Sequence, residues 1–300
     1  MADEEGRIDV DAHQVWYRRV GALDGTSGNV PLLLLHGGPG AGHDYLEPLA
    51  GLADDRAVIF YDQLGCGRSD QPDDPSLWHI DRFVREIDTV RAALGLERVH
   101  ILGQSWGGWL AIEYMLSAPR GVAGLVLAST SASLPKFVTE AGRLIDELPG
   151  DTGAAIRRHE AAGDYDHPDF MAALEVFYKR HLCRLDPWPD ALLRSGANLQ
   201  GKGGHQVYNT INGPTEFTVI GNLKDWDRID RLGEITAPTL ITVGRHDEIT
   251  PACAETIHQG IAGSRLTVFE NSAHCAHLEE TGAYLATVAA FLAEVEDGRG

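Results

Sequence analysis

Ser105 is the residue of this sequence best suited to nucleophilic catalysis. It lies within residues 103–108, which read GQSWGG and contain the pattern G-x-S-x-G. One apolar run ends at Leu102 and another begins at Trp109, so the pattern falls between an expected strand and an expected helix. Glycines on both sides of such a serine permit a sharp turn that holds its hydroxyl clear of the sheet. We therefore predict that Ser105 is a catalytic nucleophile.

The base and the acid that a catalytic serine requires are expected further along the chain. A serine hydroxyl needs a base within hydrogen-bond reach, and a carboxylate must orient that base. In folds with this pattern the acid and then the histidine follow the serine. Asp247 and His274 each follow an apolar run, ending at Val243 and Phe269. The carboxyl ends of parallel strands meet at one edge of a sheet, so we predict that Asp247 orients His274 as the base for Ser105.

Two other histidines and one other carboxylate compete for these roles. His277 lies shortly after His274, whereas His246 and Glu248 flank Asp247. The positions of Asp247 and His274 after their strands fit the expected order better. We therefore favour these two and keep the three neighbours as alternatives.

A glycine-rich turn at residues 36–40, which read HGGPG, supplies a further element. Glycines let backbone N–H groups approach an anionic oxygen, and a loop after an early strand is where an oxyanion hole receives its second donor. We predict that the backbone N–H groups of Gly38 and Trp106 form this hole.

These residues need a sheet whose strands end at a common edge. Short apolar runs alternate with helix-like stretches, which is typical of a buried parallel sheet with helices on both faces. The expected strands are residues 32–35, 57–61, 99–102, 125–128, 239–243 and 266–269, and the expected helices are residues 79–94, 106–118, 252–261 and 283–296. The sequence therefore predicts an α/β fold.

The alternation stops between about Leu134 and Leu232, where helix-like stretches such as residues 170–182 occur without clear strands. A hundred residues without structure are improbable within a compact domain, so we expect helices to fill most of this stretch. We predict one core of residues 1–133 and 233–300, interrupted by a helical cap of residues 134–232.

The composition is that of an ordinary folded protein. Of 300 residues, 43% are apolar and 23% are charged, and 25 basic against 44 acidic residues give a net charge of −19. Such a surface would repel polyanions, so we expect no nucleic acid partner.

The start of the chain and its cysteines bear on location. The first residues, MADEEGR, are acidic where a signal peptide would be basic, and no apolar run approaches the roughly 20 residues that span a bilayer. Four scattered cysteines without a C-x-x-C pair favour reduced thiols over disulfides or a zinc site. We expect a cytoplasmic protein with no membrane segment, no metal and no cofactor.

The motifs together resemble the proline iminopeptidases, the S33 peptidase family of the α/β-hydrolase fold. The resemblance includes the motifs around Gly38 and Ser105, residues 62–69 (DQLGCGRS), and the late Asp247 and His274. In the expected cap, residues 212–218 (NGPTEFT) and 221–227 (GNLKDWD) are similar to the tricorn-interacting aminopeptidase and the L-amino acid and proline amidases. The resemblance thus covers nearly the whole chain and implies an α/β-hydrolase fold with an inserted helical cap.

The resemblance also implies an amine site. In that branch of the family, carboxylates from the cap and from the position after the catalytic aspartate hold the free α-ammonium of the substrate, and the matching residues here are Glu216 and Glu248. Two carboxylates facing an ammonium would disfavour a blocked amine, because acylation leaves buried negative charge uncompensated. Trp106, Trp109 and Trp226 are candidates for apolar pocket walls, although aromatic residues more often belong to the core.

The expected activity is that of a serine aminopeptidase, releasing an N-terminal residue, often proline, from short peptides through an acyl-enzyme. An amidase or esterase acting on small amino acid amides or esters is the alternative, because the same residues serve both reactions. An inactive receptor on a hydrolase scaffold is a third interpretation, since a fold does not determine function.

Overall fold

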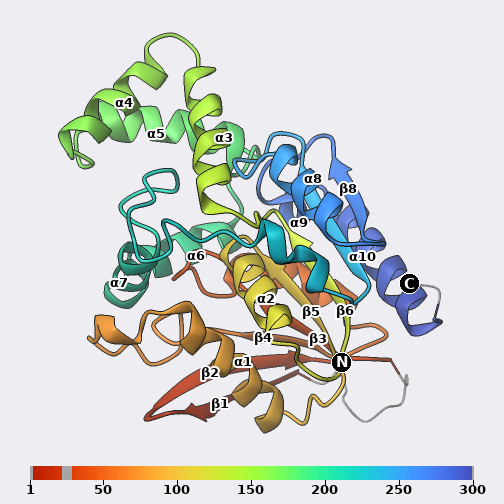
Figure 1. The fold of residues 1–300 in the computed structure, drawn as a ribbon. Coiled ribbons are helices and arrows are strands. Elements are labelled where there is room, and N and C mark those ends of the chain that lie inside the picture. Colours follow the sequence, from red (N-terminus) through yellow and green to blue (C-terminus); the bar gives the residue numbers. More distant parts are fainter. Residues whose placement is uncertain (1–2, 22–28, 299–300) are drawn as a thin grey trace.

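The fold is an α/β sandwich built on one large sheet. The computed structural model describes residues 3–21 and 29–298. Within this part of the chain, eight strands form a sheet of order β1-β2-β4-β3-β5-β6-β7-β8 (Figure 1). The strands are β1 (Asp3–Val10), β2 (His13–Val20), β3 (Leu32–Leu35), β4 (Val58–Tyr61), β5 (Val99–Gln104), β6 (Val122–Ala128), β7 (Thr239–Gly244) and β8 (Arg265–Phe269).

The strands from β3 to β8 run parallel. β3, β4, β5 and β7 are buried along their whole length, whereas β8 lies at the edge of the sheet and is partly exposed. All four leucines of β3 are at most 1% exposed, and alternate leucines contribute to the two separate hydrophobic cores. Apolar side chains on both faces explain why the central strands stand out as apolar runs in the sequence. The predicted α/β fold with a mostly parallel sheet is confirmed.

The first two strands were not predicted from the sequence. β1 and β2 form an antiparallel hairpin, and β2 pairs antiparallel with β4. β1 reads DEEGRIDV and is largely exposed at the edge of the sheet. A solvent-facing edge strand needs few apolar residues, so the search for apolar runs could not detect it.

Helices cover both faces of the sheet. One core contains residues of α1 (Ile80–Ala93), α2 (Trp106–Leu116) and α8 (Pro251–Gly260). The other contains residues of the 3-10 helix η1 (Asp44–Leu52), of α9 (Ala276–Glu279) and of α10 (Thr281–Glu296). Two short 3-10 helices, η2 (Pro75–Leu77) and η3 (Ile229–Glu234), lie in connections.

Five α-helices lie between β6 and β7 in the described chain. They are α3 (Leu134–Asp146), α4 (Thr152–Ala162), α5 (Pro168–His181), α6 (Asp190–Gln200) and α7 (Lys202–Ile211). In Figure 1, α3, α4 and α5 rise above the sheet, whereas α6 and α7 lie closer to it. The helical content predicted for this stretch is therefore present, and its treatment as a separate cap domain stays an interpretation.

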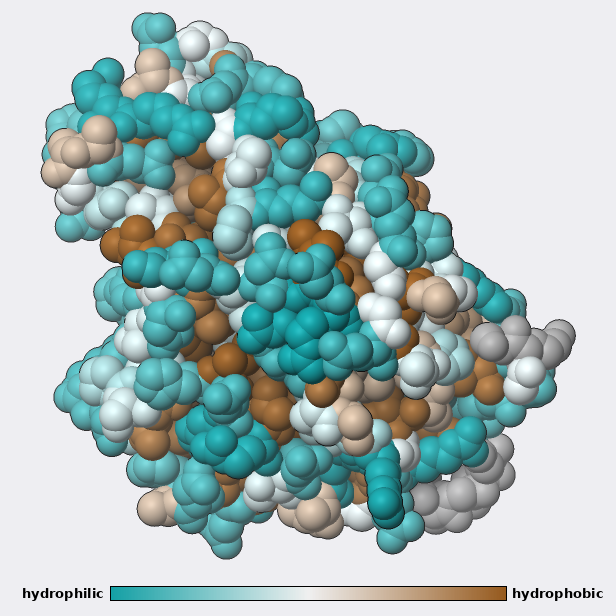
Figure 2. All heavy atoms as spheres, in the orientation of Figure 1, coloured by the Kyte–Doolittle hydropathy of each residue, from teal (hydrophilic) through white to brown (hydrophobic). Residues whose placement is uncertain are grey.

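The visible surface is largely polar. From the side shown in Figure 2, hydrophilic residues cover most of the molecule, and hydrophobic residues are visible below the helices at the top. Among the described residues, no helix combines the length and the apolar character that are needed to cross a membrane.

Candidate active site

Ser105 lies in the turn between β5 and α2, in a backbone conformation that few residues adopt. Its φ is 57° and its ψ is −123°. A Cβ at Gly103 would lie 2.2 Å from the carbonyl oxygen of Gly107, and a Cβ at Gly107 would lie 2.0 Å from that of Leu35. Both glycines of the pattern are therefore required by close backbone packing, which lets the turn raise Ser105 above the sheet edge.

Asp247 and His274 come together from two neighbouring strands. Asp247 follows β7, His274 follows β8, and Nδ1 of His274 lies 2.7 Å from Oδ1 of Asp247. The same Oδ1 accepts the backbone N–H of Ile249 at 2.8 Å. Asp247 is 1% and His274 is 5% exposed. This contact defines the orientation of the imidazole and leaves Nε2 free to face the pocket.

The alternative histidines lie elsewhere. His277 is buried against Tyr45, with Nε2 3.0 Å from the Tyr45 carbonyl oxygen. Burial lowers the pKa of His277 to about 3. His246 is half-buried in the loop before Asp247, and its backbone carbonyl contacts the ring of His181. The structure thus brings His274, not these two residues, to Asp247.

The residues of the predicted oxyanion hole approach from two loops. Gly38 lines the same pocket as Ser105, and Trp106 is the first residue of α2. The Gln63 side chain joins the loops, because its Oε1 accepts the Trp106 indole N–H at 2.8 Å and its Nε2 donates to the His36 carbonyl oxygen at 3.0 Å. Gln63 belongs to the DQLGCGRS motif, which gives that motif a structural role.

Gln104 is a residue of the site that the sequence analysis did not single out. Its Nε2 donates to the carbonyl oxygen of His274 at 3.2 Å, and its Oε1 accepts a short hydrogen bond from the Tyr45 hydroxyl. The Tyr45 hydroxyl accepts the backbone N–H of Gly37 at 2.7 Å. One buried amide therefore connects the loops of the base and of the glycine-rich turn. Its place directly before Ser105 was the one available signal.

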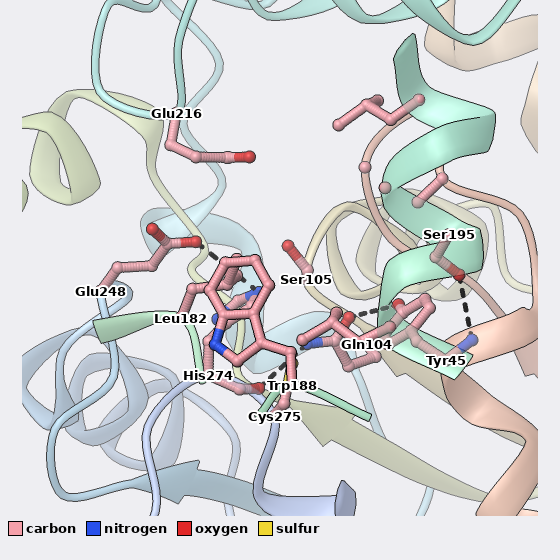
Figure 3. Close-up of a pocket in the computed structure, with 15 residues that line it drawn as sticks. Tyr45, Gln104, Ser105, Leu182, Trp188, Ser195, Glu216, Glu248, His274 and Cys275 are labelled. Atoms are coloured by element: carbon pink, nitrogen blue, oxygen red, sulfur yellow. Dashed lines mark hydrogen bonds and ion pairs between the residues drawn. The ribbon is translucent and has the colours of Figure 1, made fainter. Parts of the chain in front are cut away.

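Five of the seven predicted site residues line one pocket, drawn in Figure 3, and Asp247 and Trp106 do not line it. Ser105, His274, Glu216 and Glu248 all line this pocket, which encloses about 610 Å³ of empty space, part of it open to solvent. Ser105 lies near the middle, with the two glutamates on one side and Ser195 on the other (Figure 3).

The two glutamates come from separate parts of the chain. Glu248 directly follows Asp247, whereas Glu216 lies between α7 and η3. Oε1 of Glu248 is 3.9 Å from Nε2 of His274. Oε2 of Glu248 is buried and has no hydrogen-bond partner among the described residues. Such an orphaned carboxylate oxygen is costly unless a cation or a donor occupies the pocket.

The titration of these groups is mutually dependent. Burial raises the pKa of Glu216 and raises that of Glu248 further, with Glu216 as the next cause for Glu248. Burial alone would lower the pKa of His274, but Asp247, Glu248 and Glu216 raise it to about 9. The free site therefore favours one proton on His274 at neutral pH.

An apolar wall completes the pocket. It is formed by Leu182, Trp188, Leu192 and Leu199 of the helical segment, together with Ala41 and Cys275. The Trp188 indole is fastened by a hydrogen bond from Nε1 to the Cys183 carbonyl oxygen at 3.0 Å. Trp106, Trp109 and Trp226 instead form a buried aromatic chain. The candidates from the sequence are thus core residues, and Trp188 supplies the aromatic wall.

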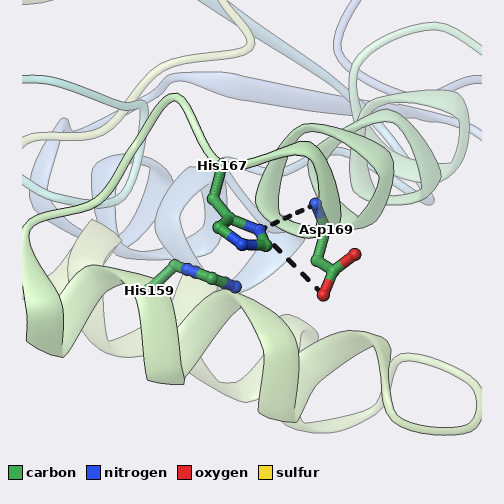
Figure 4. A group of neighbouring side chains, drawn as sticks. All are labelled: His159, His167 and Asp169. Carbon is green, nitrogen blue, oxygen red and sulfur yellow. Dashed lines mark hydrogen bonds and ion pairs between the residues drawn. The ribbon is translucent and has the colours of Figure 1, made fainter.

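A group of potential metal ligands lies at the outer end of the helical segment. His159, His167 and Asp169 bring ligand atoms within 4.8 Å of one another (Figure 4). The two imidazoles stack with centroids 4.2 Å apart and an angle of 24° between their planes. Nδ1 of His167 already accepts the backbone N–H of Asp169 at 3.1 Å. Lone pairs in nearly parallel rings do not converge on one ion, so we assign no metal to this group.

Comparison with known proteins gives a consistent result. Residues 30–281 match the family model of the alpha/beta hydrolase fold. The chain is 42% identical to a proline iminopeptidase of Saccharolobus solfataricus, over 97% of this chain and 93% of that protein. It is 43% identical to one of Heyndrickxia coagulans, over 96% and 98%. The crystal structure of the Mycobacterium smegmatis proline iminopeptidase superposes with a TM-score of 0.92 at 40% identity, covering 99% of this chain and all of that one.

Proposed function

Because the chain belongs to the proline iminopeptidase family of the α/β-hydrolase fold, we propose that it is a serine aminopeptidase acting on short peptides. Its substrate carries a free N-terminal amine, and proline is the first residue we expect it to release. The observation that carries the proposal is one pocket lined by Ser105, His274, Glu216 and Glu248, with Asp247 in contact with Nδ1 of His274.

In the proposed reaction, Ser105 Oγ attacks the carbonyl carbon of the first residue while Nε2 of His274 takes the hydroxyl proton. The resulting oxyanion accepts hydrogen bonds from the backbone N–H groups of Gly38 and Trp106, each contributing roughly 100- to 1,000-fold to the rate. His274 then protonates the leaving amine, and the acyl-enzyme forms. Water, activated by His274, hydrolyses this ester and restores Ser105.

Glu216 and Glu248 are proposed to bind the substrate's α-ammonium. The support is their shared position on one side of Ser105 and the unpartnered, buried Oε2 of Glu248. A cation between them compensates the negative charge, and an acylated amine does not. The chain would thereby remove residues from the N-terminus only.

Residues 134–232 are proposed to act as a cap that shapes the side-chain pocket. Glu216, Trp188 and the leucines of the apolar wall lie in this segment. The end of α5 also contacts the catalytic loops, because the His181 carbonyl oxygen accepts the backbone N–H groups of Glu248 at 3.1 Å and of His274 at 3.2 Å. Movement of the cap would therefore affect both amine binding and the base.

The remaining proposals concern the location of the protein, its partners and its cofactors. A cytoplasmic location is supported by four cysteines that are all free and buried. The net charge of −19 disfavours nucleic acid as a partner. Every group that the proposed reaction uses belongs to the chain itself, so we propose that it needs no cofactor.

A panel of aminoacyl aryl-amides tests the function. Proline, alanine, leucine and phenylalanine derivatives are compared with free and with N-acetylated amines. We expect cleavage of the free forms only, with proline among the best. Equal cleavage of acetylated forms would contradict the amine site and favour the alternative, an amidase or esterase of broader scope.

A further inference from the structure

The pocket holds more acidic side chains than basic ones. Asp247, Glu216 and Glu248 all lie near His274, and among the described residues no lysine or arginine lines the pocket. Glu248 is 2% exposed and Asp247 is 1% exposed. An ionised carboxylate removed from water is stabilised by a nearby cation, and without one it tends to take up a proton, which is the direction in which burial shifts the pKa values of Glu216 and Glu248. In the free protein, the one side chain of this group that can become a cation is His274.

The geometry places the imidazole between these carboxylates. Nδ1 contacts Asp247 at 2.7 Å, and Nε2 lies 3.9 Å from Oε1 of Glu248. A proton on Nε2 is thus stabilised from both ends of the ring. An imidazolium cannot accept the proton of Ser105, so the charge pattern that suits the free protein opposes the first step of the reaction.

The other titratable groups around this cluster do not change the balance. Tyr208 on α7 and Tyr178 on α5 face the two glutamates, and their phenol pKa values are raised well above the usual one, first by burial. His277 on α9 has its pKa lowered to about 3 by burial, and burial raises the pKa of the Cys275 thiol. All four are neutral near pH 7, so the charge of the site is shared by His274 and the carboxylates.

We propose that the substrate's own α-ammonium switches on the base, by entering between Glu216 and Glu248 and displacing the proton from Nε2 of His274. This inference rests on the proposed aminopeptidase function and assigns a second role to the glutamates. The proton leaves to solvent, the ammonium keeps all of its own protons, and no covalent bond of the substrate changes in this step. His274 is then neutral and ready to accept the hydroxyl proton of Ser105.

The physical reason is that two cations compete for the same carboxylates. The ammonium provides the compensating charge that the imidazolium provided before, and it adds a repulsion between like charges. Linkage requires that the effect is mutual, so protonation of His274 weakens ammonium binding by the same factor by which the ammonium weakens proton binding. A tenfold effect corresponds to one unit in the pKa of His274.

Loss of the proton from His274 on ammonium binding would make the enzyme select cationic substrates by their rate of reaction as well as by their affinity. A neutral or acylated substrate that enters the pocket leaves His274 protonated, and it reacts slowly even when it is bound. A cationic substrate both binds and creates the active base. The carboxylates would therefore affect kcat as well as KM, whereas carboxylates that only bound the amine would act through KM alone.

A direct test is the titration of His274 by NMR in the Ser105→Ala protein, which cannot form the acyl-enzyme. The imidazole Cε1–H signal is assigned by its absence in Ser105→Ala/His274→Asn. L-Prolinamide is the cationic probe, and N-acetyl-L-prolinamide is the neutral probe. We expect saturating L-prolinamide to lower the pKa of His274 by at least one unit, and the neutral probe to leave it unchanged. An unshifted pKa in the L-prolinamide complex overturns the inference.

Variants sharpen the test. Glu248→Gln should already lower the pKa of His274 in the free protein, and L-prolinamide should then shift it less. Glu270→Gln is the matched control, because Glu270 is exposed at the start of the loop after β8 and paired with Arg245, and it should leave the titration unchanged. An equal shift in Glu248→Gln and the parent would contradict the role of Glu248.

The kinetics of the unmodified protein separate this inference from the function itself. The pH profile of kcat for L-proline aryl-amide is compared with the pH profile of kcat/KM for p-nitrophenyl acetate, a substrate without charge. The apparent pKa of the acidic limb should be at least one unit lower in the first profile than in the second. Cleavage of the aryl-amide with both limbs at the same pH overturns the switch and leaves the aminopeptidase function intact. Failure to bind L-prolinamide or to cleave any free-amine substrate overturns both.

Discussion

The carboxyl edge of the sheet and the helical segment 134–232 contribute different kinds of residue to one pocket. The edge supplies Ser105 and His274, whose positions follow from strand ends and short loops. The helical segment supplies Glu216 and the wall around Trp188. In our proposal the edge performs the reaction and supplies one of the two amine-binding carboxylates, Glu248, while the helical segment supplies the other and the apolar wall. The comparison indicates that catalytic residues lie where the backbone holds side chains rigidly, whereas residues that select the substrate can lie on an added helical segment whose sequence can change.

The largest expected effect comes from substituting the nucleophile at the carboxyl edge of the sheet. Ser105→Ala removes the nucleophile, and we expect kcat for L-proline aryl-amide to fall by about 10⁴-fold or more. Far-UV circular dichroism should be unchanged, because alanine fits the same turn. Ser117→Ala, at the other end of α2, is the matched control and should retain activity. A folded Ser105→Ala protein with normal turnover would disprove the assignment.

Removing the charge of Glu216, which lies in the helical segment, should affect mainly substrates with a free amine. Glu216→Gln keeps the shape of the side chain and removes its charge, so we expect kcat/KM for free-amine substrates to fall by about 100-fold. Hydrolysis of p-nitrophenyl acetate should change much less, because this substrate has no ammonium. Equal losses for both substrates would mean that Glu216 supports the fold or the reaction rather than the amine. Glu175→Gln, an exposed change on α5, serves as control.

The apolar wall should influence the choice of first residue. Trp188→Ala removes the aromatic face, and we expect kcat/KM for proline aryl-amide to fall about tenfold, with a smaller loss for the phenylalanine derivative. The ratio of the two rates is the measurement. Met171→Ala, exposed on α5, should leave the ratio unchanged. An unaltered ratio in Trp188→Ala would show that the selective wall lies elsewhere.

The smallest expected effect is on stability and concerns His274 at the edge. Its folded pKa of about 9 is raised from 6.5, because the three carboxylates outweigh burial. The imidazolium therefore contributes stability that is fully present below about pH 6.5 and is lost as the pH rises through about 9. We expect His274→Asn to lower Tm by a few degrees at pH 6 and by less at pH 9.5. A Tm difference that stays constant across this range would contradict the raised pKa.

The sequence allowed the sheet and the candidate nucleophile to be predicted for a clear physical reason. Buried parallel strands are continuous apolar runs, and Gly103 and Gly107 are needed wherever backbones approach as closely as they do around Ser105. The β1–β2 hairpin escaped prediction because its first strand is polar and exposed. The local pattern carries information only where the environment is strongly apolar or sterically tight.

Gln104 and Trp188 illustrate what local patterns leave out. Gln104 acts through partners at Tyr45 and His274, far from it in the chain. Trp188 was indistinguishable in sequence from the tryptophans of the core, because aromatic residues suit both places. Glu216 was proposed through resemblance alone, since a single glutamate among 44 acidic residues has no distinguishing spacing.

By itself, the sequence determined the alternation of strands and helices, the sharp turn at Ser105 and the order of the candidate acid and base. These depend on periodicity, glycine sterics and chain order, which are local properties. Tertiary structure alone decided that Nδ1 of His274 meets Asp247, and that Glu216 joins Glu248 in one pocket. The charge balance of that pocket depends on distances between segments far apart in the chain, and no local pattern encodes them.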